Sequence, residues 1–256
     1  MIDIHSHVLY SLDDGARTLE DSLAMVRMAA EHGTTDLVAT PHANPEYRFD
    51  AEINAQRLAQ IEAACGGALR LHTGCDFHLS FDNIQDAIAN PQKYTLDHKN
   101  YLLVEFSDLL IFHNTAEIFS RLLDAGMIPV ITHPERNSLL RQRLEPIAEW
   151  VRSGVRVQVT AQSLTGRFGK RAEAFARTLL DRNLVHVIAS DAHDCEHRPP
   201  RMDEAYHWLT ANYSAATAML LCLTNPGAAL TGDRMQEPDT SKASRSASKW
   251  FGFLRG

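Results

Sequence analysis

The sequence predicts an α/β fold in which parallel β-strands, each followed by a helix, close into a barrel. Short apolar runs with strand composition alternate with helical patterns along the chain. Most of these runs are almost continuously apolar, which is typical of strands buried on both faces of a parallel sheet. Polar groups follow nearly every run, as they do at the carboxyl ends of barrel strands, where barrel enzymes place their chemistry.

Seven strands are expected in this barrel. They span Met1–Ile4, Asp36–Thr40, Leu69–Gly74, Tyr101–Phe106, Ile128–Thr132, Arg156–Thr160 and His186–Ser190. Seven such units favour a barrel over a doubly wound sheet, and neither GxGxxG nor GxxxxGK[ST] follows a strand. Because the first and last strands of a closed barrel are neighbours, we expect the MIDIHSH and IASDAH segments to meet.

Helices are expected between the strands, and Leu19–His32 is the clearest of them. Thr18 is suited to the N-cap, Asp21 stands at the capping-box position, and Gly33 ends the helix. The other predicted helices are Ala51–Cys65, Thr115–Ala125, Leu144–Ser153, Lys170–Arg182 and Met202–Ala211, with a further apolar helix near Ala215–Leu223 that closes the body.

Composition narrows the class of protein. The chain has 256 residues, 45% of them hydrophobic, and a formal net charge of −7, which argues against a duplex nucleic-acid binder. The four cysteines lack CxxC spacing, so we expect reduced thiols and a cytoplasmic location. No signal-peptide pattern and no apolar run of membrane-spanning length is present, so no integral membrane segment is expected.

Two regions are expected along the chain. We expect residues 1–232 to form one folded domain and residues 233–256 to form a disordered tail, because QEPDTSKASRSAS is polar and lacks periodicity. The tail finishes KWFGFLRG, and its role stays open, as does the oligomeric state of the chain.

Metal-type ligands follow the predicted strands in a series. The candidates are His5, His7, Asp14, His42, Asp76, Glu105, His133, Asp191 and His193. Nitrogen and oxygen ligands without sulfur suit Mn, Fe, Zn or Co in a catalytic site better than a structural zinc. Nine ligands exceed what one ion needs, so two or three ions bridged by carboxylates are predicted. Such a cluster can hold a hydroxide at neutral pH and bind oxygens on phosphorus.

Two arginines lie just past strand ends, where a substrate would bind. Arg136 stands in THPER and Arg198 in HRPP. Guanidinium groups match phosphate oxygens, so we predict phosphate binding, with a loop-anchoring ion pair as the alternative. Gln158 and Gln162 could also reach the mouth of the barrel, whereas Asp13 is interpreted as a turn residue in DDG.

The motifs DIHSH, DDGA, ATPH, LVEFS, THPER, VIASDAH and RPP, in this order and spacing, resemble the polymerase and histidinol phosphatase (PHP) family. Within it they resemble the bacterial tyrosine-protein phosphatases of capsule and exopolysaccharide loci, the CpsB/YwqE type. The resemblance runs from Met1 to about Gly232. It implies a distorted (β/α)7 TIM-like barrel that holds three metal ions, most often manganese.

The resemblance also distributes the ligands among the ions. It implies one ion on His5, His7, Asp76 and Asp191, a second on Asp76, Glu105 and His133, and a third on Asp14, His42 and His193, with Arg136 and Arg198 as the phosphate-binding arginines. The family usually has Glu where this chain has Asp76 in GCDF. The side chain is shorter by one methylene, roughly 1.3 Å of reach, so weaker metal occupancy is expected there.

The function implied is hydrolysis of phosphotyrosine on the tyrosine-rich tail of a membrane-bound bacterial autokinase, with His42, Asp191 and the two arginines as the catalytic groups. One Cys-x5-Arg spacing is present, from Cys195 to Arg201 in CEHRPPR, and we expect hydrolysis without a phosphoenzyme. His42 or a metal-bound water could supply the proton to the leaving phenolate, whose pKa is about 10.

Other functions share part of this pattern. A PHP phosphoesterase for a small phosphomonoester such as histidinol phosphate would use the same ligands. An amidohydrolase also begins with HxH in a barrel, but it typically carries a bridging Lys where this chain has Glu105. A regulatory binding protein with an inactive site is the non-enzymatic alternative, and the nearly complete ligand set argues against it.

Overall fold

The computed structural model describes residues 1–239. Its strands are β1 (Ile2–Ser6), β2 (Asp36–Ala39), β3 (His42–Ala43), β4 (Arg70–Thr73), β5 (Asp76–His78), β6 (Tyr101–Glu105), β7 (Ile128–Ile131), β8 (Arg156–Thr160) and β9 (Val187–Ala189). The predicted helix after β1 is α1 (Leu19–Glu31), and Thr18 and Asp21 form the capping box there.

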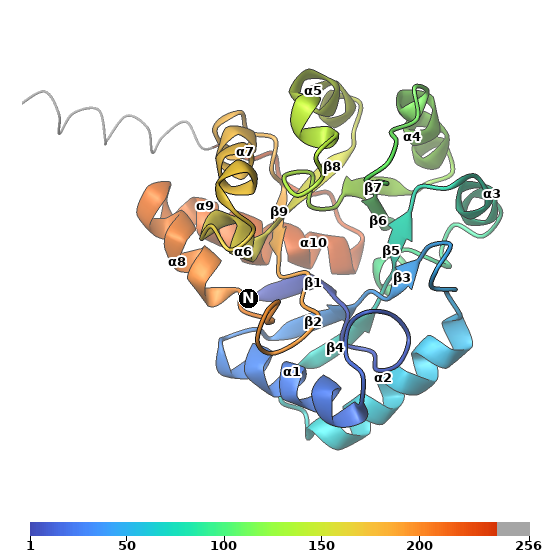
Figure 1. Cartoon of the computed structure of the whole chain (residues 1–256), viewed down its shortest axis with the longest axis vertical. Helices are drawn as coiled ribbons and strands as arrows, with labels where there is room; N and C mark the ends of the chain where they lie inside the picture. The colour runs from blue at the N-terminus through green and yellow to red at the C-terminus, as the bar shows by residue number, and fades with distance from the viewer. Residues whose placement is uncertain (240–256) are drawn as a thin grey trace, which may run out of the picture.

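The remaining helices are α2 (Ala51–Cys65), α3 (Phe81–Ala89), α4 (Thr115–Asp124), α5 (Leu144–Arg152), α6 (Ala161–Leu164), α7 (Lys170–Asp181), α8 (Asp203–Asn212), α9 (Ala215–Met219) and α10 (Asn225–Thr231), with short helical turns η1 (Leu96–His98), η2 (Leu140–Gln142) and η3 (Leu220–Thr224). Most of these helices lie on the outside of the sheet, whereas α10 lies near the centre of the view and packs on the interior (Figure 1). Helices α3, α6 and α10 add to those expected from the sequence.

Every strand pairing is parallel, and the sheet curls on itself. One sheet has the order β1-β2-β4 and the other β3-β5-β6-β7-β8-β9. The first and last strands meet, since Ser6 forms a parallel bridge with Ala192 and the amide of Asp191 donates to the carbonyl of His5 at 2.9 Å. Figure 1 shows β1 beside β9. The MIDIHSH and IASDAH segments are therefore adjacent, as expected.

Two of the predicted strands are broken. The second ends at Ala39 and resumes as β3 after Pro41, and the third ends at Thr73 and resumes as β5. At the second break the chain is crowded, because a Cβ on Gly74 would lie 2.7 Å from the Leu96 side chain. The breaks matter for the site, because His42 and Asp76 both lie on the resumed segments, where they pair in register.

Two layers of core hold the sheet. Inside it, Ile4, Val38, Leu103, Val130 and Val187 pack together, and side chains of α10 close this cluster. A larger cluster fills the space between β5–β9 and their covering helices. The interior is filled with apolar side chains, and the predicted ligands lie beyond it at the carboxyl ends of the strands.

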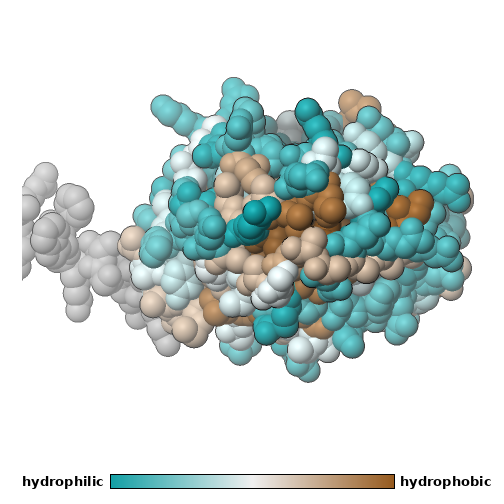
Figure 2. Space-filling model, turned by 90° about the horizontal axis from the view of Figure 1, so that it is seen from below, coloured by the Kyte–Doolittle hydropathy of each residue, from teal (hydrophilic) through white to brown (hydrophobic). Residues whose placement is uncertain are grey.

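The face that carries α1 and α2 is largely hydrophilic, with an apolar area near its middle (Figure 2). Helix α2 buries only Asn54 and Ile61 of its 15 residues. Among residues 1–239, no helix is long and apolar enough to cross a membrane.

The first residues of the predicted tail lie against the domain. Met235 is buried, its amide donates to the hydroxyl of Tyr101, and that hydroxyl donates to the carbonyl of Asp233. The KWFGFLRG segment lies outside the described residues.

Candidate metal centre

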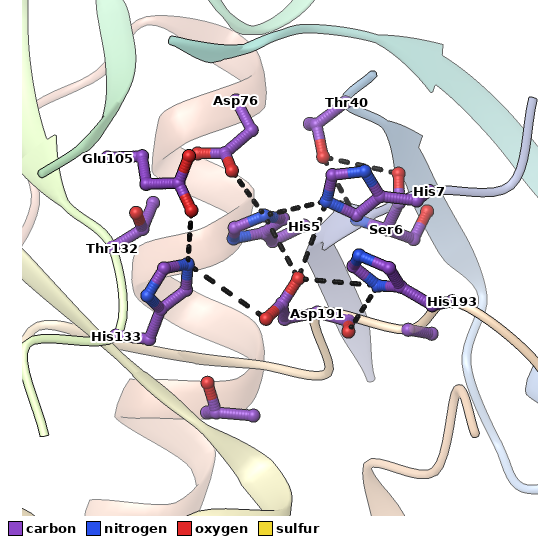
Figure 3. Close-up of polar contacts among 12 residues, drawn as sticks. His5, Ser6, His7, Thr40, Asp76, Glu105, Thr132, His133, Asp191 and His193 are labelled. Atoms are coloured by element: carbon purple, nitrogen blue, oxygen red, sulfur yellow. Dashed lines mark hydrogen bonds and ion pairs between the residues drawn. The ribbon is translucent and has the colours of Figure 1, made fainter. Parts of the chain in front are cut away.

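The nine predicted ligands come together at the carboxyl ends of the strands. They are supplied by β1 and the loop after it (His5, His7, Asp14), β3 (His42), β5 (Asp76), β6 (Glu105), the start of the loop after β7 (His133) and the loop after β9 (Asp191, His193). Figure 3 shows seven of them pointing toward one another, namely His5, His7, Asp76, Glu105, His133, Asp191 and His193.

Their ligand atoms form four overlapping groups, each within 4.8 Å: His7, Asp14, His42 and His193; His5, His7 and Asp76; His5, His133 and Asp191; and His42, Asp76 and Glu105. The first group contains the three ligands that the resemblance assigns to one ion. His133 groups with His5 and Asp191, whereas Asp76 and Glu105 group with His42. The carboxylates that we expect to bridge thus lie between several imidazoles.

Two imidazoles at the end of β1 are oriented by neighbouring oxygens. Nδ1 of His5 lies 2.9 Å from Oε1 of Gln158, and Nδ1 of His7 lies 2.7 Å from Oδ2 of Asp13. Amide and carboxylate oxygens are acceptors, so each Nδ1 carries its proton. Each Nε2 then presents its lone pair to the centre, 3.4 Å from Oδ1 of Asp191. Histidine ligands of metals are typically held in this way.

The imidazole of His193 is oriented in the same way, with a backbone carbonyl as the acceptor. Nδ1 of His193 lies 3.0 Å from the carbonyl oxygen of Asp191, and its Nε2 lies 3.3 Å from Oδ1 of Asp14. His42 reaches the same Asp14 oxygen with Nε2 at 3.3 Å, and the ring of Tyr47 stacks on it. Asp14 is therefore shared by two imidazoles at the outer edge of the cluster.

Asp76 is the most deeply buried carboxylate of the cluster. Its side chain is fully buried, and neither of its oxygens accepts a hydrogen bond, although Nδ1 of His42 lies 3.1 Å from Oδ2. An ionised carboxylate without donors is costly to bury. A cation between Asp76 and the surrounding imidazoles would satisfy both oxygens, so the residues present fit a metal.

The electrostatics of the cluster agree with this fit. Burial opposes protonation of His42, but Asp14 and Asp76 outweigh it and raise its pKa to about 11. Burial lowers the pKa of His133 well below its usual value, and Arg136 adds to the effect. The carboxylates thus attract positive charge, while His133 stays neutral and able to coordinate.

Backbone strain coincides with two of the ligands. His133 has φ +34° and Asp191 has φ +53°, both in the left-handed region that non-glycine residues seldom adopt. Such residues persist where the surrounding structure holds them, and they cluster at functional sites.

The two predicted arginines meet at one carboxylate. Arg136 and Arg198 both donate to Oδ2 of Asp191, and the guanidinium of Arg136 lies over the ring of Phe168. Nε of Arg198 is buried without an acceptor. Both guanidinium groups consequently lie at the edge of the ligand cluster, with donor capacity left over.

Sequence reasoning missed the roles of two acidic residues. Asp13 does shape the turn, since it accepts from the amide of Gly15, but its other oxygen holds His7. Glu135 is buried and anchors the THPER loop by accepting from the amide of Thr160 and the hydroxyl of Ser163. For both Asp13 and Glu135, the signal available in the sequence was a charged residue within a motif that the fold buries.

The two glutamines also have defined positions. Gln158 holds His5, as described above. Gln162 donates to the carbonyl of Pro199 and so ties α6 to the RPP loop that follows the last ligands. Gln158 therefore reaches the cluster, and Gln162 supports a loop beside it.

A curled parallel sheet whose carboxyl ends gather imidazoles, carboxylates and guanidinium groups defines a metal-binding α/β protein. The chain belongs to the capsular polysaccharide synthesis CpsB/CapC family, whose model matches residues 1–231. Tyrosine-protein phosphatase YwqE of Bacillus subtilis is 32% identical over 86% of this chain and 88% of its own length. Tyrosine-protein phosphatase CpsB of Streptococcus pneumoniae is 30% identical over 88% of this chain and 96% of its own length.

A solved structure from crystallographic work on YwqE and CpsB, described as unique metal-dependent tyrosine phosphatases, matches this fold with a TM-score of 0.87. The identity is 31%, and the match covers 94% of this chain and 99% of that one.

Proposed function

We propose that this chain is a metal-dependent protein phosphatase that hydrolyses phosphotyrosine. The observation that carries the proposal is the convergence of Arg136 and Arg198 on Asp191, within a cluster of metal-type ligands. Phosphoryl transfer needs charge stabilisation on the phosphoryl oxygens, and guanidinium donors beside cations supply it. The substrate class is supported by the relatives named above, which are tyrosine-protein phosphatases.

We assign the cofactor as three divalent ions, with manganese preferred over Fe, Zn and Co. The proposed ligands are His5, His7, Asp14, His42, Asp76, Glu105, His133, Asp191 and His193. Such ions, when bound, act as Lewis acids toward phosphoryl oxygens and lower the pKa of water. The donor chemistry and the orphaned oxygens of Asp76 support the assignment.

The chain's own groups have separate tasks in this proposal. Arg136 and Arg198 bind the phosphate, and the unpaired Nε of Arg198 supports that role. Asp13 and Gln158 keep Nδ1 of their imidazoles protonated. The two ring nitrogens of His42 face Asp14 and Asp76, so its task is to hold a metal ion and not to hand a proton to the leaving phenolate.

Several finer assignments belong to the same proposal. We count the broken strands as single barrel strands, which makes the fold a distorted (β/α)7 barrel formed by residues 1–232. The substrate is the tyrosine-rich tail of a membrane-bound bacterial kinase that controls polysaccharide export. A cytoplasmic location is supported by the four free cysteines, Cys65, Cys75, Cys195 and Cys222.

The experiment is phosphate release by metal-stripped protein that has been repleted separately with manganese, zinc or iron(II). A phosphotyrosine peptide, a phosphoserine peptide and histidinol phosphate are compared. We expect metal-dependent release that is fastest on phosphotyrosine and is abolished in His42→Ala. A preference for histidinol phosphate would instead identify the chain as a phosphoesterase for a small phosphomonoester. No release with any metal would overturn the assignment as an enzyme.

A further inference from the structure

Three exposed apolar side chains follow two neighbouring strands of the site. Phe81 is 72% exposed, Leu109 is 90% exposed and Leu110 is 52% exposed, and we call these three the apolar rim. Only two other large hydrophobic residues within 1–239 are comparably exposed, namely Ile53 on α2 and Met219 on α9. Three of the five exposed large hydrophobic residues within 1–239 thus lie at the start of α3 and on the loop that follows β6.

Along the chain, the residues of the apolar rim follow two of the candidate ligands closely. Phe81 is five residues after Asp76, and Leu109 is four residues after Glu105. The two strands are paired, with His78 opposite Glu105, and the amide of Leu79 donates to the carbonyl of Glu105 at 3.0 Å. Both loops therefore leave the sheet side by side, at the end where the ligands gather (Figure 1).

Hydrogen bonds hold both the start of α3 and the loop after β6 in place. Asn83, just past Phe81, donates to the carbonyls of Ala43 at 2.7 Å and His78 at 2.9 Å. On the loop after β6, the carbonyl of Ser107 accepts from Asn137 at 3.0 Å, and Asn137 follows Arg136 directly. The exposed side chains are consequently anchored beside the phosphate-binding loop.

We propose that the apolar rim binds the residues that flank phosphotyrosine in the protein substrate. This inference rests on the proposed function and extends it from the phosphoryl group to the peptide. Exposed apolar surface at the mouth of a site commonly marks an interaction surface. In the proposed function Arg136 and Arg198 bind the phosphate beside the metal centre, and a small phosphomonoester has no peptide residues for the rim to bind. A phosphorylated protein segment must cross the edge of the mouth.

The apolar character of the rim determines which kind of peptide segment it binds. Phe81, Leu109 and Leu110 offer no charge to the substrate, so burying them favours aromatic or aliphatic residues next to the phosphotyrosine. A tyrosine-rich segment has that character. The rim therefore separates protein substrates from small phosphate esters that share the same phosphoryl chemistry.

The test compares two substrates in one set of variants. A phosphotyrosine peptide with aromatic flanks reports on rim and site, and p-nitrophenyl phosphate reports on the site alone. For Leu109→Ser/Leu110→Ser and for Phe81→Ser we expect kcat/KM on the peptide to fall about tenfold, mainly through KM. On p-nitrophenyl phosphate the same variants should stay within about twofold of the parent. Ile53→Ser and Met219→Ser are matched controls that should change neither value.

Equal losses on both substrates would mean that the rim acts through the metal centre, and unchanged values on both would mean that the peptide does not use it. Either result overturns the proposal. Peptide affinity of the manganese-loaded proteins is measured in parallel by fluorescence polarisation, so that a failure of turnover is distinguished from a failure of the rim. If the wild-type protein self-associates through the rim, and the serine variants only become monomeric, a second copy covers the rim and the proposal is wrong.

Discussion

Oδ2 of Asp13 lies 2.7 Å from Nδ1 of His7 and also accepts from the amide of His42 at 3.1 Å. One carboxylate thus fixes the ring orientation of one candidate ligand and the backbone of another. The three residues come from neighbouring parts of the fold. His7 and Asp13 lie in the loop between β1 and α1, and His42 begins β3.

Asp13→Asn should weaken manganese binding by roughly 10- to 100-fold, because both carboxylate oxygens accept hydrogen bonds and the amide NH2 group of asparagine would face a donor at one of the two positions. Activity should recover at saturating manganese, since the ligands themselves are intact. Metal titration of activity and calorimetry measure the change. Asp124→Asn, on an exposed part of α4, is the control. An unchanged metal affinity would exclude the positioning role of Asp13.

Asp76→Asn should remove at least one bound metal ion per chain. The side chain is shared between ligand groups and is completely buried, so no water-exposed carboxylate can substitute for it. Inductively coupled plasma mass spectrometry on the purified, manganese-repleted protein counts the ions, and circular dichroism checks the fold. Full metal content in a folded Asp76→Asn protein would place the bridging ligand elsewhere.

Arg136→Lys should lower kcat/KM on the phosphotyrosine peptide about tenfold or more, with metal content unchanged. Lysine keeps the charge but loses the planar fork that binds two phosphate oxygens and stacks over Phe168. The corresponding prediction holds for Arg198→Lys. Arg171→Lys on the exposed side of α7 serves as the matched control. Loss of metal together with activity would instead assign these arginines to the integrity of the cluster.

His186 should make folding stability depend on pH. Burial and the charge of Arg156 lower its pKa to about 4, against the attraction of Glu237. The folded protein keeps this ring neutral, whereas the unfolded chain protonates it below about pH 6.5. Its contribution to the free energy of unfolding is therefore complete above that pH and decreases as the pH falls toward 4.

Chemical denaturation of metal-free protein between pH 4.5 and 7.5 measures this effect. The free energy of unfolding of the wild type relative to His186→Phe should decrease toward low pH. A constant difference between the two proteins would show that the ring is not kept neutral in the fold.

Met235→Ala should lower the free energy of unfolding by about 2–4 kcal/mol, because the side chain is buried against the interior cluster. Met219→Ala, at an exposed position, should have little effect. Urea denaturation gives both values. A negligible loss for Met235→Ala would support a domain that ends at residue 232.

Much of this architecture follows from local sequence signals. Apolar runs locate the strands because burial on both faces demands them, and Thr18 with Asp21 marks the start of α1. The break at Gly74 was not predicted, since crowding between a glycine and the Leu96 side chain depends on distant packing. The break after Ala39 was not predicted either, although Pro41 lacks the amide hydrogen that strand pairing uses.

By itself, the sequence determined the parallel α/β class, the candidate ligands and the two arginines, because these depend on residue type and on position relative to apolar runs. Only the tertiary structure decided which ligand lies beside which, that Asp13 and Gln158 orient imidazoles, and that the segments after β5 and β6 leave the sheet side by side. Those relationships join residues whose separation in space is fixed by the curl of the sheet, and no local pattern in the chain records that curl.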